Sequence, residues 1–155
     1  MTIFEYKVSP AWLSPDTPEY IFRIIVTDDE DNNIITWFHD KKYLHTIPPN
    51  EIDKIKNIIK EHSELFLIPK YLEPNTVLDG EEYSFVFSDG KNTNSFSGLN
   101  ILNYDRSPRK NATLALRVAR TIKEKVLDPN GVRTIIPARL QHWPKYRKPS
   151  NNIKI

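Results

Sequence analysis

The feature that most constrains the fold is an alternating segment that ends in a turn signal. Residues 82–88 place aromatic rings at every second position, which is typical of a β-strand with one buried face. Asp89-Gly90 is a dipeptide favoured in two-residue hairpin turns, and residues 91–97 then return as a more polar partner strand. The pattern predicts a tight hairpin in which Tyr83 pairs with Phe96, with the return strand at an edge of its sheet.

Further strands are expected near the N-terminus. Residues 3–8 alternate polar with apolar, and residues 20–27 are almost continuous in β-branched and aromatic side chains. The second pattern is typical of a strand that is buried on both faces and central in its sheet. The acidic run 28–33 predicts a turn into residues 34–39 as the hairpin partner, and residues 43–47 are a candidate extension.

Two later segments have the spacing of amphipathic helices, residues 51–62 and residues 111–126. The expected apolar stripes are Ile52, Ile55, Ile58 and Ile59 in the first, and Ala112, Ala115, Ala119, Ile122 and Val126 in the second. The element order along the chain is βββαββα. It predicts an α+β fold, an antiparallel sheet of about five to six strands with both helices on one face.

The size and composition of the chain are those of one domain. Its 155 residues are 39% hydrophobic, enough to bury a core. Mean hydropathy is −0.53, and no apolar run approaches the roughly 20 residues that cross a bilayer, so no membrane partner is expected. We expect a single α+β domain over residues 1–136, in which residues 132–136 are a candidate last strand. Residues 137–155 form a basic, proline-containing C-terminal tail that we expect to be loosely ordered.

Cysteine is absent from the sequence. A disulfide framework, a thiolate nucleophile and Cys-ligated metal centres are therefore excluded. Glu5 and Lys7 stand where a signal peptide would need its apolar stretch. Together these observations favour a cytoplasmic location.

Recognisable catalytic and cofactor motifs are also missing. The sequence has no phosphate loop, no dinucleotide fingerprint and no nucleophile elbow, and its 4 glycines are too few to build their turns. The acidic segment 29–40 departs from a calcium loop because Ile34 stands where that loop needs glycine. We therefore assign no catalytic, cofactor-binding or metal-ligating residue and expect no cofactor. The one enzymatic alternative, a hydrolase of unfamiliar type built around His39 and Asp40, ranks last.

Charge is distributed unevenly along the chain. Residues 1–105 carry 9 basic and 18 acidic side chains, whereas residues 106–155 carry 13 basic and 2 acidic ones. Trp143 and Tyr146 stand among the last of these cations. Two interpretations remain open: the basic segment folds over the acidic part, or it presents a cationic surface to an acidic partner, either protein or nucleic acid.

The sequence in and around the predicted hairpin is similar to a pattern found in other proteins. Val77-Leu-Asp-Gly80, residues 83–90 and Ser97-Gly-Leu-Asn100 are followed by a helical segment. This arrangement resembles a pattern in small uncharacterised bacterial proteins, some of which look like cytosolic immunity partners of secreted toxins. The resemblance implies a non-enzymatic binding role and supplies no catalytic residues.

The leading prediction is a non-enzymatic cytoplasmic protein that occludes a macromolecular partner, most simply another protein. Such an interface concentrates its affinity in a few aromatic or arginine anchors. The candidate anchors are Trp12, Trp37, Arg117, Arg120 and Trp143. The alternative is a nucleic-acid-binding protein that acts through residues 106–155.

Overall fold

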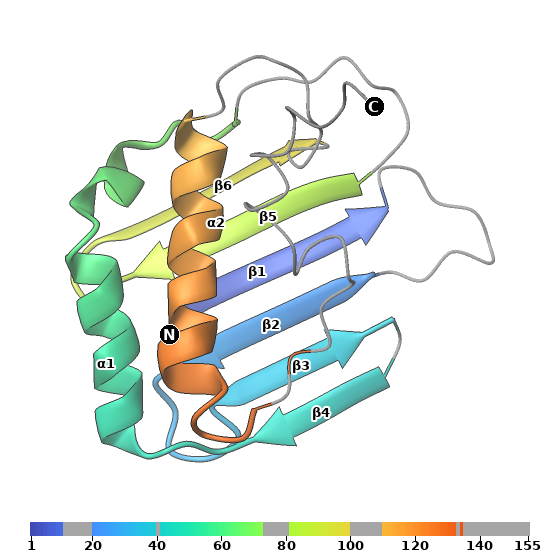
Figure 1. Cartoon of the computed structure of the whole chain (residues 1–155), viewed down its shortest axis with the longest axis vertical. Coiled ribbons are helices and arrows are strands. Elements are labelled where there is room, and N and C mark those ends of the chain that lie inside the picture. The colour runs from blue at the N-terminus through green and yellow to red at the C-terminus, as the bar shows by residue number, and fades with distance from the viewer. Residues whose placement is uncertain (11–19, 40, 73–80, 100–109, 133, 135–155) are drawn as a thin grey trace, which may run out of the picture.

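The computed structural model describes residues 1–10, 20–39, 41–72, 81–99, 110–132 and 134. Within these residues, one antiparallel sheet carries helices against one of its faces (Figure 1). The strands are β1 (Thr2–Pro10), β2 (Phe22–Thr27), β3 (Ile34–Phe38), β4 (Lys41–His45), β5 (Glu81–Ser88) and β6 (Thr93–Leu99). The helices are α1 (Pro49–Lys60), the 3₁₀ helix η1 (Ser63–Leu67), α2 (Lys110–Ile122) and its π-helical continuation η2 (Lys123–Leu127). The predicted α+β class and element order are confirmed, with β4 as the extension.

The strand order across the sheet is β4-β3-β2-β1-β5-β6. Strand β1 therefore joins two groups of strands that are distant in sequence, because it pairs with β2 on one side and β5 on the other. The return strand of the predicted hairpin, β6, lies at an edge as expected. Strand β2 is central, but the prediction that it is buried on both faces is wrong. Its residues alternate between buried and half-buried, since the helices α1 and α2 cover only one face.

The core lies between the sheet and the two helices. The isoleucine stripe of α1 and the alanine-rich stripe of α2 are buried, as predicted. Opposite them, Phe85 stacks on Tyr6 with 4.9 Å between ring centroids and meets Phe96 at 5.5 Å. The strands supply these buried side chains to the core: Phe4, Tyr6, Val8, Phe22, Ile24, Val26, Ile34, Tyr83, Phe85, Phe87 and Phe96. This close-packed layer fixes which strand positions face away from the helices.

The hairpin register differs from the prediction by two residues. Phe85, rather than Tyr83, pairs with Phe96 across β5 and β6. The aromatic rings still share one face, because a shift of two residues preserves the side on which a strand residue points. The predicted pairing is therefore wrong, whereas the predicted aromatic face is confirmed.

The cause of this shift is a longer turn at residues 89–92. The carboxylate of Asp89 accepts hydrogen bonds from the backbone N–H groups of Lys91 at 2.8 Å and Asn92 at 2.7 Å. A type I′ turn would require positive φ at both Asp89 and Gly90, but only Gly90 has it, at 94°. The side-chain hydrogen bonds stabilise a turn that is centred one residue later than a two-residue turn would be.

Two asparagines, Asn33 buried and Asn94 half-buried, bind segments outside the sheet to strand ends or strands of the sheet. Asn33 donates to the carbonyl oxygen of Ile47 and accepts from its N–H, both at 2.9 Å, and Asn33 is only 2% exposed. Asn94 donates to the carbonyl oxygens of Leu65 and Ile68 at 2.8 and 2.9 Å. Each amide thus hydrogen-bonds to backbone groups of a segment that lies outside the sheet.

The C-terminal predictions fall mostly beyond the described part of the chain. Of the candidate strand over residues 132–136, only Val132 and Thr134 are described, and neither belongs to a strand. Residues 137–155 lie outside the described residues.

Candidate partner-binding surface

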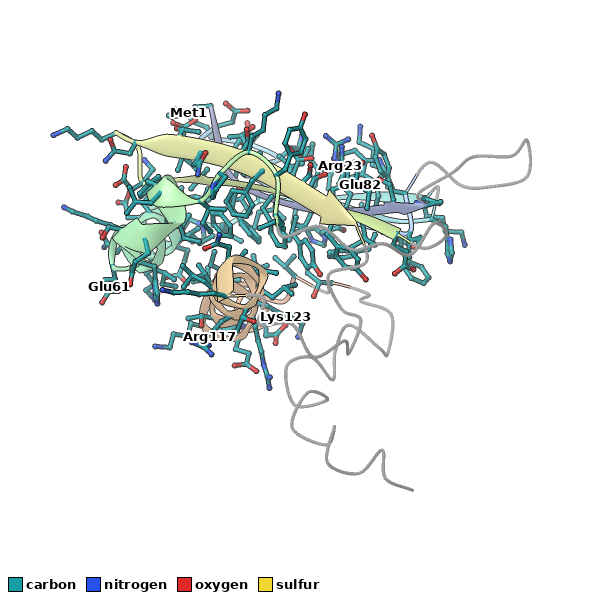
Figure 2. All side chains as sticks on the ribbon, turned by 90° about the horizontal axis from the view of Figure 1, so that it is seen from above. Met1, Arg23, Glu61, Glu82, Arg117 and Lys123 are labelled. Carbon is teal, nitrogen blue, oxygen red and sulfur yellow. The ribbon has the colours of Figure 1, made fainter. Side chains whose placement is uncertain are left out.

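One face of the sheet carries no helix of the described chain. Figure 2 views the sheet edge-on, with Arg23 on this helix-free face and Arg117 on the helical side. Directly paired strand residues point to the same face. The register therefore places Lys42, Trp37, Arg23 and Lys7 side by side across β4, β3, β2 and β1. Three cations and one aromatic ring thus form a row across four strands, with one residue from each strand.

Tyr20, just before β2, completes what we call the cation–aromatic row: Lys7, Tyr20, Arg23, Trp37 and Lys42. The guanidinium carbon of Arg23 lies 4.9 Å from the ring centroid of Tyr20 and 4.7 Å from that of Trp37. The ammonium of Lys7 lies 5.9 Å from the Tyr20 ring, and that of Lys42 lies 5.7 Å from the Trp37 ring. These distances are within the range of cation–π attraction, so the row holds its own side chains in place.

Arg23 is held further by two hydrogen bonds. Its Nε donates to Oε2 of Glu5 at 2.9 Å, and its Nη1 donates to the hydroxyl of Tyr20 at 2.8 Å. The Arg23 and Glu5 side chains are 21% and 15% exposed, so the pair is partly shielded from water. An arginine held in this way loses little conformational freedom when a partner binds.

The row leads into a shallow groove on the same face, over β1, β5 and β6. The groove encloses about 220 Å³. Charged side chains, serines and residues of the strands line it: Glu5, Lys7, Lys70, Ser84, Phe85, Val86, Ser95, Phe96 and Ser97. The helix-free face thus offers a hollow with charged and hydrogen-bonding groups beside the cation–aromatic row.

The structure does not bring the five predicted anchors together. Trp37 lies in the cation–aromatic row on the helix-free face. Arg117 and Arg120 belong to α2, which packs on the opposite face of the sheet (Figure 2). Trp12 and Trp143 lie outside the described residues. A surface that uses Trp37 is therefore separate from one that uses the arginines of α2.

Sequence reasoning missed Lys7, Tyr20, Arg23 and Lys42. A signal for Lys7 and Arg23 was present, because each alternates with core residues and so must point away from the core. Their proximity was not predictable, since it depends on which strands become neighbours.

The basic side chains near the end of α2 are engaged with local acids. Arg120 donates to Glu124 at 3.0 Å and Lys123 donates to Asp128 at 2.9 Å. They flank a void of about 40 Å³ that is lined mainly by core side chains, including Tyr6. Burial raises the pKa of the Tyr6 phenol above its ordinary value, so the group stays protonated. The small volume and apolar lining mark the void as part of the core.

The residues of the hydrolase alternative are only partly described. His39 is exposed, has a φ of 56° and packs its ring against Phe38 at 4.5 Å. Asp40 lies outside the described residues. In the part of the chain that the structure describes, no three His, Asp or Glu side chains gather so that they could hold a metal ion.

No family model matches this chain, and no curated protein matches it either. The helices in the described residues are all too short or too polar to cross a membrane.

Proposed function

We propose that this protein is a non-enzymatic, cytoplasmic binding protein of the immunity type, which acts by occluding a macromolecular partner docked on the helix-free face. The observation that carries this proposal is the cation–aromatic row. Arginine, tryptophan and tyrosine are the residue types that dominate binding energy at protein interfaces. Here Tyr20, Arg23 and Trp37 are already locked against one another, which lowers the entropic cost of docking.

The charges on this face favour an acidic protein as the partner. Glu5 balances Arg23, but Lys7 and Lys42 form no ion pair with any described residue. Both rings of the row already carry a cation within 6 Å of their centroids. A base-stacking platform for single-stranded nucleic acid needs free ring faces, whereas carboxylates can bind the lysines without displacing anything.

The test is affinity capture from a native extract, with bound proteins identified by mass spectrometry. We expect wild-type protein and Arg117→Ala, a control on the opposite layer, to capture the same acidic partner. Trp37→Ala should reduce its affinity by about 30-fold, the effect of losing roughly 2 kcal/mol at an interface anchor. Capture of no partner at any salt concentration, or equal affinity for Trp37→Ala, would contradict the proposal. Circular dichroism of each variant controls for loss of fold.

A second candidate is nucleic-acid binding through residues 106–155, which the excess of 13 basic over 2 acidic side chains favours. Binding of this kind weakens steeply with salt because cation–phosphate contacts release counterions. A fluorescent single strand should then bind the full chain at low salt and bind poorly once residues 137–155 are removed. Affinity that does not depend on salt or on those residues would dispose of this candidate.

A further inference from the structure

The two edges of the sheet differ in what covers them. At β6, the N–H of Ser97 donates to the carbonyl oxygen of Lys70 at 3.0 Å, and the N–H of Leu72 donates to that of Ser97 at 2.7 Å. The segment after η1 thus forms a short parallel bridge along this edge, at Tyr71. At β4, residues 41–45 make no backbone hydrogen bond to any described segment except β3. An unpaired strand edge is a template for another strand.

The side chains of β4 suit such an addition. Tyr43 is 43% exposed and Leu44 is 52% exposed. On the helix-free face, Leu44 pairs with Ile35, and Ile35 pairs with Ile25, so an apolar row runs inward from the edge. Lys42 points to the same face two residues away. The bare edge is therefore continuous with the cation–aromatic row.

We propose that β4 accepts an extended acidic segment of a partner protein as a seventh strand of the sheet. The added strand would place an apolar side chain against Leu44 and, two residues along, a carboxylate against Lys42. Its backbone would supply affinity by hydrogen bonding to the outer edge of β4, while this alternating pattern would supply specificity. The inference rests on the proposed function, since it names the chemistry of the partner that docks on the helix-free face.

Charge argues against two other occupants. A second copy of β4, paired antiparallel over the full strand, would place Lys42 opposite Leu44 and Lys41 opposite His45, so it supplies no carboxylate for either lysine. A nucleic acid has no amide backbone to continue the sheet, and the rings of Tyr20 and Trp37 already carry cations. An acidic polypeptide satisfies both the strand edge and the lysines.

The test uses a fluorescein-labelled, end-blocked decapeptide of alternating Glu and Val. A matched Lys–Val decapeptide and a twelve-residue oligothymidylate are the control probes. By fluorescence anisotropy, we expect the full-length protein to bind the Glu–Val peptide at least about tenfold more tightly than either control. Hydrogen exchange followed by NMR should show slower exchange for amides of β4 and unchanged exchange for those of β6. Equal binding of both peptides, protection confined to other strands, or tighter binding of the oligonucleotide would each overturn the proposal.

Charge reversal sharpens the test. Lys42→Glu should make the protein bind the Lys–Val peptide more tightly than the Glu–Val peptide. Leu44→Ser should weaken the binding of both peptides. Lys125→Glu, the same charge change at an exposed lysine of η2, should leave the preference unaltered. Failure of the inference alone would appear as a partner captured in a Trp37-dependent manner with no peptide protection at β4. Failure of the proposed function alone would appear as protection at β4 with no captured partner.

Discussion

The two faces of the sheet use the same strands for opposite purposes. On β5, Phe85 points toward the helices and is 1% exposed, whereas Val86 points to the helix-free face and is half-buried. On β2, Ile24 is buried in the core, while its neighbour Arg23 is part of the cation–aromatic row. Core packing is thus concentrated on one face of the sheet, and the cation–aromatic row lies on the other.

The physical reason is the difference between burying an apolar side chain and pairing an exposed charge. Full burial of a large apolar side chain contributes about 1.5–3 kcal/mol. A solvent-accessible ion pair or cation–π contact contributes about 1 kcal/mol or less. The helix-free face can therefore change its side chains at little cost to the fold.

The largest expected effect compares neighbours in β5. Phe85→Ala should lower the free energy of unfolding by about 3–5 kcal/mol, because the ring packs against Tyr6 and Phe96 and would leave a cavity. Val86→Ala, on the other face beside Glu5, should cost about 1 kcal/mol or less. Urea unfolding measures both. Similar losses for the two variants would break the contrast between the faces.

A smaller loss of stability is expected in the β2–β3 turn, where Asn33 is buried and Asn32 is exposed. Asn33→Ala should cost about 1–3 kcal/mol, because the buried N–H and carbonyl of Ile47 would lose their partner. The neighbouring Asn32 is exposed with a φ of 49°, which glycine adopts freely. Asn32→Gly should therefore be neutral within about 0.5 kcal/mol. Denaturant midpoints that rank the two variants in the reverse order would show that burial does not set the cost here.

The turn between β5 and β6 sets the register of these two strands, and with it the face on which each of their side chains lies. Gly90→Val should cost about 1–3 kcal/mol, because Gly90 has a φ of 94° and a β-branched residue is strained there. Asp89→Asn should cost less, since an amide oxygen can accept the same bonds from Lys91 and Asn92. Thermal melts compare them. Negligible shifts in both variants would mean that the chain does not turn at these residues.

The smallest effect is a pH dependence of the same turn. Hydrogen bonds from the backbone of Asn92, and then of Lys91, hold the pKa of the Asp89 carboxyl below its usual range. A lowered folded-state pKa contributes stability that is present above about pH 4, the ordinary pKa of aspartate, and is lost as pH falls through the folded value. Wild type should therefore lose more stability than Asp89→Asn between neutral and strongly acidic pH. Parallel pH profiles from chemical unfolding would contradict the assigned hydrogen bonds.

Much of the secondary structure was predictable because its signals are local. The stripe Ile52, Ile55, Ile58 and Ile59 identified α1, and the alternation around Phe85 identified β5. The register of the hairpin was not predictable. The Asp89 carboxylate accepts hydrogen bonds from the N–H groups of Lys91 and Asn92, and these bonds move the centre of the turn. The bonds from Asn33 to Ile47 were also missed, since they join loops 14 residues apart.

The candidate surface was predictable only in part. Trp37 is a large aromatic residue in a strand, and its type alone marked it as a possible anchor. Arg23 and Lys7 gave no such signal, because their importance comes from the rings and strands beside them. Arg117 and Arg120 had the same chemical signal as Trp37 but lie on the other layer.

By itself, the amino-acid sequence determined which segments become strands and helices and, except in β2, which side of each is apolar, because these properties depend on residues only a few positions apart. Only the tertiary structure decided that β1 lies between β2 and β5, which brings Lys7 alongside Arg23 and next to the groove over β5 and β6. It also decided that β6 is bridged at its edge, whereas β4 pairs with β3 alone among the described segments. Strand neighbours are chosen by packing and hydrogen bonding over the whole chain, so no local pattern encodes them.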